Sequence, residues 1–257
     1  MEAAVVLAWV SSLWRYPVKS MLGERVDALR IDDDGVAGDR EWAVVDDHGR
    51  ALSAKTVPEL LFARVQTRDG SVCVSIPDGA EVVAGEPAAD VALARWLGRP
   101  VRLVRAEPDV QCRYEVHVDA TDNDSPVVVA DGPRGTFRDS RHPAHLLTTA
   151  SLRAASRHYP EGEWDPRRFR PNVLIDTDGE GFVEDDWVGS RVAAGGVVFD
   201  IRKRCMRCTI PNRPQPGLRA DVTIARSLAE HHGLDLGVYA GISSPGTIEI
   251  GDQVSLA

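Results

Sequence analysis

The first 105 residues alternate short β-rich runs with turn signals, and this pattern points to a fold class. Asp- and Gly-rich stretches at 32–35, 46–49 and 68–70 mark the turns. Frequent turns between short runs of β-forming residues are typical of small barrels and sandwiches. We therefore predict a small β-barrel or sandwich over residues 1–105.

A change in composition divides the chain. Residues 106–144 are rich in Asp, Pro and Gly, which predicts an interdomain linker or a long functional loop. The chain then falls into two domains, 1–105 and 106–257. The second domain contains further strands, including a pair over 191–205 whose second strand brings two cysteines to its end.

A few helices are expected among the strands. Their apolar residues recur at helical spacing and their ends carry capping or stop residues. The predicted helices span 88–97, Thr149 or Ser151 to about His158, and 221–232. The predicted class is mostly β with a few helices.

Composition excludes several functional classes. The chain has 257 residues and a net charge of −9, which argues against a general nucleic-acid binder. It contains neither a secretory leader pattern nor a run of about 18 apolar residues. We therefore expect no membrane association, a cytoplasmic location and reduced thiols. Arginines cluster at 167–170, 202–207 and 213–219, which indicates a local anionic ligand unless they are ordinary solvated surface charges.

Two of the four cysteines, Cys205 and Cys208, stand in the sequence RCMRCT. Thiols at this spacing can share a metal ion, exchange a disulfide, or divide their roles so that one binds a soft ion and the other packs nearby. A structural zinc site is a weaker alternative, because no second CxxC or HxxxH pair accompanies them.

Five short motifs carry a family resemblance. They are RYPVKS at 15–20, GDREW at 38–42, RFRPN at 168–172, RCMRCT at 204–209 and SPGTI at 244–248. In this order they resemble two-part MOSC proteins, which include the mitochondrial amidoxime reducing component and its bacterial relatives. The same domain ends eukaryotic molybdenum cofactor sulfurases. The resemblance implies an N-terminal MOSC-type β-barrel, a MOSC β-barrel domain, and a molybdenum–molybdopterin cofactor held between them.

The resemblance also implies site residues at the matching positions. Cys208 matches the protein ligand to molybdenum in relatives that act on N-hydroxylated substrates. Lys19 and Ser20 match a turn that grips cofactor oxygens, and Arg40 matches a further anion-binding position. Arg170 belongs to the matching RPN turn, where a guanidinium can bind phosphate through two hydrogen bonds.

Further candidates are supported less directly. Asn172 completes the RPN turn, and its amide could donate to pterin atoms. Arg207 adjoins Cys208 and would lower the pKa of its thiol. Cys205 is either a supporting thiol or a small buried side chain. The remaining candidates, Thr149 and Ser151, lie at a predicted helix start. The backbone N–H groups there could face an anion, or Ser151 could simply cap the helix.

Histidines and departures from the family complete the sequence analysis. His142, His145, His231 and His232 form no convincing ligand set and are interpreted as surface or capping residues. The sequence TIPNRPQPGLRAD after Cys208 differs from the amidoxime-reducing members, so their substrates do not transfer.

Three functions remain open. The first is a molybdenum-cofactor oxidoreductase that reduces N–O or related bonds of a small-molecule substrate. Because the chain has neither an iron–sulfur cysteine framework nor a GxGxxG turn, its electrons would come from a separate ferredoxin- or reductase-type protein. The second is a cofactor or sulfur carrier that uses Cys205 or Cys208. The third is a non-catalytic small-molecule binding protein.

Overall fold

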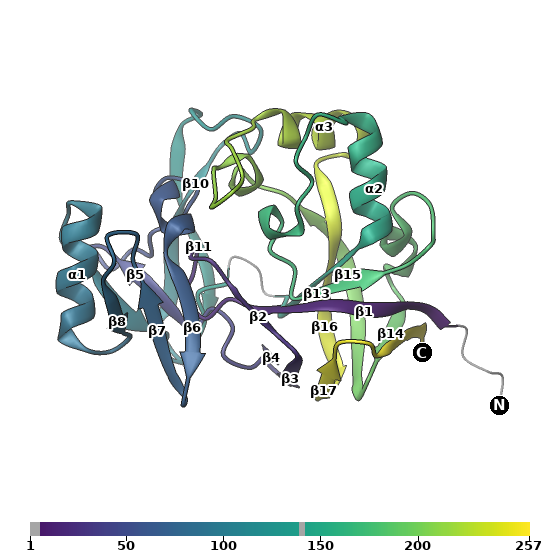
Figure 1. The fold of residues 1–257 in the computed structure, drawn as a ribbon, viewed down its shortest axis with the longest axis horizontal. Helices are drawn as coiled ribbons and strands as arrows, with labels where there is room; N and C mark the ends of the chain where they lie inside the picture. Colours follow the sequence, from purple (N-terminus) through teal and green to yellow (C-terminus); the bar gives the residue numbers. More distant parts are fainter. Residues whose placement is uncertain (1–5, 139–141) are drawn as a thin grey trace.

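The computed structural model describes residues 6–138 and 142–257 (Figure 1). Strands predominate in these residues, and the three α-helices lie at the periphery. The predicted class, mostly β with a few helices, is confirmed.

Seven strands close into a barrel on the right of Figure 1. Around the ring they follow the order β1 (Val6–Arg15), β18 (Gln253–Leu256), β14 (Arg191–Ala194), β15 (Val197–Met206), β16 (Asp235–Ser244), β12 (Ala144–Thr148) and β13 (Val173–Asp176). β13 then pairs antiparallel with β1, so the ring has no free edge. The β12–β13 pair is parallel.

The barrel interior is filled by alternating apolar side chains. Inward-facing positions recur every second residue, because successive side chains of a strand point to opposite faces. Fully buried examples from three different strands are Leu13, Phe199 and Val238. Short strands flank the ring: β2 (Glu24–Val26) extends β1, while β17 (Gly246–Glu249), β3 (Ala28–Asp32) and β4 (Gly35–Val36) form a separate sheet.

A second unit lies on the left of Figure 1. β5 (Trp42–Val45) pairs with β9 (Arg102–Arg105), and β6 (Arg64–Arg68), β7 (Ser71–Ser75) and β8 (Glu81–Val83) form an antiparallel sheet. Helix α1 (Pro87–Leu97) buries Ala89 and Leu93 against these strands. It confirms the helix predicted over 88–97. Gly98 ends the helix in the left-handed conformation, with a φ angle of 65°. A 3₁₀ turn, Pro58–Phe62, precedes β6.

The segment 106–144, expected to be a loop, contains an antiparallel hairpin of β10 (Gln111–His117) and β11 (Val127–Arg134). In β10 the buried Cys112 and Tyr114 flank the exposed Arg113, which is the alternation of a half-buried strand. Three of the six Asp residues of this segment lie in the connection between the two strands, and β11 itself contains Asp131, Gly132 and Pro133. The hairpin shares a buried cluster with β5.

Two helices cover the barrel at the upper right of Figure 1. α2 (Thr149–His158) and α3 (Thr223–His232) confirm the two helices predicted in the second half. They pack Ala155, Ile224 and Leu228 over the barrel wall. Three 3₁₀ turns connect the remaining elements: Pro166–Arg168, Val183–Trp187 and Ile210–Asn212.

The two halves of the sequence are interleaved in space. β1, from the first half, closes the barrel of the second half, and the β10–β11 hairpin packs on β5 of the first. Loops from both halves therefore meet between the two units. None of the helices within the described ranges is long and apolar enough to cross a membrane.

Candidate functional site

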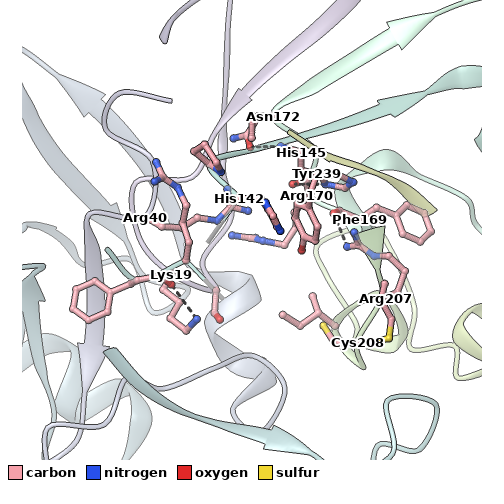
Figure 2. Close-up of a pocket in the computed structure, with 17 residues that line it drawn as sticks. Lys19, Arg40, His142, His145, Phe169, Arg170, Asn172, Arg207, Cys208 and Tyr239 are labelled. Atoms are coloured by element: carbon pink, nitrogen blue, oxygen red, sulfur yellow. Dashed lines mark hydrogen bonds between the residues drawn. The ribbon is translucent and has the colours of Figure 1, made fainter. Parts of the chain in front are cut away.

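A cleft between the two units collects most of the residues predicted from the motifs. Of the ten candidates, the seven that line it are Lys19, Ser20, Arg40, Arg170, Asn172, Arg207 and Cys208. Figure 2 shows Lys19 and Arg40 entering from one side and Arg207 and Cys208 from the other, with Arg170 between them. We call this cleft the cationic groove.

The backbone at three of these residues adopts an unfavourable conformation. Ser20, Arg40 and Arg170 have φ angles of 64°, 53° and 56°. Only five non-glycine residues with positive φ occur in the described ranges, and these are three of them. Each such residue costs on the order of 1–2 kcal/mol, and such residues concentrate at ligand sites. The surrounding fold therefore holds these three turns in a strained form at the groove.

A buried carboxylate, Asp39, fixes one wall of the groove. Its Oδ2 atom lies 2.6 Å from Arg40 Nη1 and 3.5 Å from Arg138 Nε. Its Oδ1 atom accepts from the backbone N–H of Tyr16 at 2.9 Å and from Asn172 Nδ2 at 3.2 Å. Burial alone would raise the pKa of Asp39, but Arg40 and Arg138 hold it below its usual range. Asp39 is therefore an anion that orients two cations toward the groove.

Two guanidinium groups lie over the ring of Tyr16. The centres of Arg40 and Arg170 lie 4.5 and 4.2 Å from the centroid of its ring. Its hydroxyl donates to the carbonyl of Pro171 at 3.1 Å, and burial raises its pKa above the usual value. Arg170 also donates to the carbonyl of Met21 at 2.6 Å. The Tyr16 ring and the Met21 carbonyl orient Arg170, whereas Arg40 is held by the ring and by its ion pair with Asp39.

The groove is strongly positive. Lys19 donates to the carbonyl of Phe137 at 3.1 Å and lies 4.4 Å from the centroid of the Tyr114 ring. The groove is lined by five cations, namely Lys19, Arg40, Arg138, Arg170 and Arg207. No described residue that lines it is Asp or Glu. Such a concentration of one charge sign favours an anionic ligand.

The two cysteines lie in different environments. Cys205, in β15, is fully buried, and Arg207 Nη1 lies 2.8 Å from its Sγ atom. Burial raises the pKa of the Cys205 thiol. Cys208 follows the end of the strand, is partly exposed, and lines the groove. The arginine expected to assist Cys208 instead donates to Cys205 and to the carbonyl of Phe169.

Two family models match the chain in succession. The model for the MOSC N-terminal beta barrel domain matches residues 7–97, and the model for the MOSC domain matches residues 126–255. The chain belongs to the MOSC family.

Individual relatives are distant. The mitochondrial amidoxime-reducing component 1 of Mus musculus is 24% identical over 96% of this MOSC chain and 82% of its own length. A molybdenum cofactor sulfurase of Solanum lycopersicum is 26% identical over 81% of this chain, which spans only 29% of that protein. The crystal structure of the YUAD protein of Bacillus subtilis aligns with a TM-score of 0.48 at 12% identity, over 97% of this chain and 94% of that one.

The side chains of two motif residues, Asn172 and Ser20, form hydrogen bonds mainly within the protein. The Oδ1 atom of Asn172 accepts from the backbone N–H of His145, and its Nδ2 atom donates to Asp39 and to the carbonyl of Trp14. The hydroxyl of Ser20 accepts from the backbone N–H of Ala54 at 2.9 Å. Asn172 thus links segments from both halves of this MOSC chain, and Ser20 fixes a turn within the first half.

The predicted helix start at Thr149 and Ser151 does not line the groove. Ser151 is fully buried, and its hydroxyl donates to the carboxylate of Glu184 at 2.5 Å. Thr148, which caps α2, donates to the same carboxylate at 2.6 Å. The hydroxyl of Thr149 donates to Asp176 at 2.7 Å. The expectation that Thr149 and Ser151 face the ligand is corrected, because this helix start is occupied by a carboxylate of the protein itself.

Sequence reasoning missed several groove residues. His142 and His145 were interpreted as surface or capping residues, yet both line the groove, and His145 is buried. Burial, and then Arg207, lower the pKa of His145 well below its usual value. Both rings lie 5.7 Å from that of Tyr239. Isolated histidines in or near a strand carry no signal of such a place, whereas Arg138 stands in the sequence 134–141, whose three arginines and one aspartate could have indicated it.

Proposed function

We propose that the protein is a molybdenum-cofactor oxidoreductase that reduces N–O or related bonds of small molecules. The observation that carries the proposal is the partly exposed thiol of Cys208 in a groove lined by five cations and by no described carboxylate. A molybdopterin group has a sulfur-ligated metal at one end and a phosphate at the other, so it needs a thiolate and fixed cations. The similarity to an amidoxime-reducing component supports the choice.

The groove residues fit these needs. Cys208 would hold the metal, and Lys19, Arg40 and Arg170 would bind the anionic groups. Arg207 also fits, because its buried Nε atom has no hydrogen-bond partner among the residues that the structure describes. When bound, the cofactor supplies two-electron redox chemistry at the metal. The protein residues orient the cofactor and offset its negative charge.

The proposed reaction consumes two electrons and two protons and releases water, converting an amidoxime to an amidine or a hydroxylamine to an amine. The chain has no iron–sulfur framework and no nucleotide-binding GxGxxG turn. We therefore propose that a separate ferredoxin- or reductase-type protein supplies the electrons. No group of three or more His, Cys, Asp or Glu residues in the described ranges could hold a metal, so Cys208 would be a single protein ligand.

The test is elemental and pterin analysis of protein made in a host that synthesises the cofactor, followed by an activity assay. We expect about one molybdenum per chain, and reduction of an amidoxime with an artificial one-electron donor but not with NADH alone. Protein that contains stoichiometric zinc and no pterin would overturn the proposal.

A cofactor or sulfur carrier is the second candidate, supported by the similarity to molybdenum cofactor sulfurases. In that function Cys208 would bear the sulfur, since Cys205 is fully buried. Loaded protein that fails to reduce N-oxygenated compounds but passes cofactor or sulfur to an apo-acceptor would favour the carrier.

A further inference from the structure

A second cavity adjoins the cationic groove on the far side of Cys208. Five residues line both spaces, namely His142, Met206, Arg207, Cys208 and Tyr239. The cavity extends from there toward β10, and we call it the side chamber. A ligand in the groove and another in the side chamber would both reach the thiol of Cys208.

The walls of the side chamber differ from those of the groove. Val116 and Val118 give it an apolar side, and Tyr114 and Tyr239 add two aromatic rings. Thr209 also lines it, is fully buried, and has a hydroxyl without a hydrogen-bond partner among the described residues. A buried polar group without a partner costs about 1–3 kcal/mol, so a hydroxyl at this place is suited to a ligand. The chamber therefore fits an aromatic or aliphatic molecule with a polar group.

The lysines of the protein are confined to this region. The chain contains 30 Lys and Arg residues, and only Lys19, Lys55 and Lys203 are lysines. Lys19 lines the groove, while Lys55 and Lys203 line the side chamber. A lysine carries a compact point charge, and its replacement by arginine changes the geometry of recognition. A chain that uses arginine almost everywhere else thus keeps its ammonium groups around Cys208.

Both chamber lysines lie against the aromatic walls. The Nζ atom of Lys55 is 4.9 Å from the ring centroid of Tyr114, and that of Lys203 is 5.9 Å from the ring centroid of Tyr239. Lys55 is buried, and Lys203 is exposed at the end of β15. None of the described residues that line the chamber is Asp or Glu. The chamber therefore presents positive charge beside an apolar wall.

We propose that the side chamber is the substrate pocket and that it selects N-oxygenated compounds with an apolar or aromatic body and a carboxylate. In this arrangement Lys55 and Lys203 bind the carboxylate, Thr209 bonds a polar group, and the N–O group faces Cys208. The substrate class rests on the proposed oxidoreductase function, whereas the anion preference of the chamber can be measured without turnover.

The first experiment measures binding with inert probes by calorimetry. We expect the protein to bind 3- or 4-carbamoylbenzoate at least about tenfold more tightly than benzamide. Lys203→Met should weaken carbamoylbenzoate binding about two- to fivefold, as expected for an exposed ion pair. Lys55→Met should weaken it more, and Lys203→Arg should restore part of the affinity. Arg30→Met removes an exposed cation outside the chamber and should change neither affinity.

The second experiment uses loaded protein with an artificial donor and compares carboxylated benzamidoximes with benzamidoxime. We expect the carboxylated compounds to have the higher kcat/KM, and the ratio to fall in Lys203→Met through KM. Equal kcat/KM and equal binding of neutral and anionic probes would overturn the inference. If neither benzamidoxime is reduced while carbamoylbenzoate binding depends on Lys203, the oxidoreductase proposal fails and the anion preference of the chamber stands.

Discussion

The cationic groove and the start of helix α2 both gather groups that bind anions, but they differ in how their charge is balanced. At α2, Thr148 and Ser151 surround the buried carboxylate of Glu184, which comes from the same chain. In the groove, five cations converge, and Asp39, behind one wall, pairs with two of them, Arg40 and Arg138. A set of anion-binding groups therefore indicates a ligand site where the cations outnumber the carboxylates that the protein supplies.

Burial shifts the pKa values of Glu184, at the helix start, and His145, in the groove, in opposite directions. Burial raises the pKa of Glu184, although Ser151 and Thr148 partly offset the effect. Burial, followed by Arg207, lowers the pKa of His145 in the groove. At neutral pH the imidazole of His145 is thus uncharged among cations, which limits repulsion in the groove.

Substitution of Cys208 should have the largest effect on activity. It tests whether the reaction takes place in the groove. We expect Cys208→Ser to lower donor-driven reduction of an amidoxime by about a thousandfold, since a serine hydroxyl is a poor ligand for a soft metal. Metal analysis and kcat/KM provide the measurement. Cys205→Ser, at the buried neighbour, is the matched control and should retain molybdenum and a larger share of activity. Loss of metal in Cys205→Ser alone would reverse the assignment of the two thiols.

The second-largest effect should be on cofactor binding, which we expect to depend on the groove and not on the helix start. We expect Arg170→Gln to weaken binding of the pterin cofactor about 10- to 100-fold, because a charge-assisted contact to phosphate is lost. The measurement is fluorescence of the oxidised pterin retained after dialysis. Ser151→Ala, at the helix start, should leave retention unchanged. If Ser151→Ala releases the cofactor as readily as Arg170→Gln, the two regions are not functionally distinct.

Most of the fold follows from local sequence patterns. Turn spacing gave the mostly β class, and apolar periodicity placed all three helices within a few residues. The hairpin within 106–144 was missed because the connection between its strands is rich in Asp, and because β11 contains Asp131, Gly132 and Pro133, which are typical of turns. Closure of the barrel by β1 was also inaccessible, since strand pairing across more than 150 residues depends on the whole fold.

The motifs marked residues that the fold brings into one groove, and local patterns could not reveal those whose position depends on tertiary structure. Lys19, Arg40 and Arg170 reach the groove from three distant segments that the motifs had marked. The expectation for Ser151 and Thr149 was wrong because no local pattern reveals that their hydroxyls donate to Glu184 and Asp176. His145 was missed because its burial arises from strands that pair across the barrel.

The stability of the helix start should respond to Ser151→Ala by a moderate amount. The substitution removes a hydrogen bond to a buried carboxylate, which is worth about 1.5–3 kcal/mol for charged groups. We expect the free energy of unfolding to fall by about 1–2 kcal/mol in urea denaturation at neutral pH, with pterin retention unaffected. Thr149→Ala, at the exposed neighbour, should cost less. An unchanged midpoint in Ser151→Ala would mean that Glu184 does not depend on this contact.

Acidification should produce the smallest effect and should act with opposite sign at the two regions. The folded-state pKa of His145 lies below 6.5, so its contribution to stability is present above that pH and is lost as the pH falls toward the lower folded value. The folded-state pKa of Glu184 lies above 4.5, so its contribution is full below that pH and is lost as the pH rises through the folded value. As the pH falls below 6.5, His145→Gln should therefore lose less stability than the wild type, by up to about 1 kcal/mol per pH unit. As the pH falls toward 4.5, Glu184→Gln should lose more than the wild type. Urea unfolding of the metal-free protein across this range measures both slopes, and slopes that change in the same direction would show that burial does not disfavour the charged form at one of the two residues.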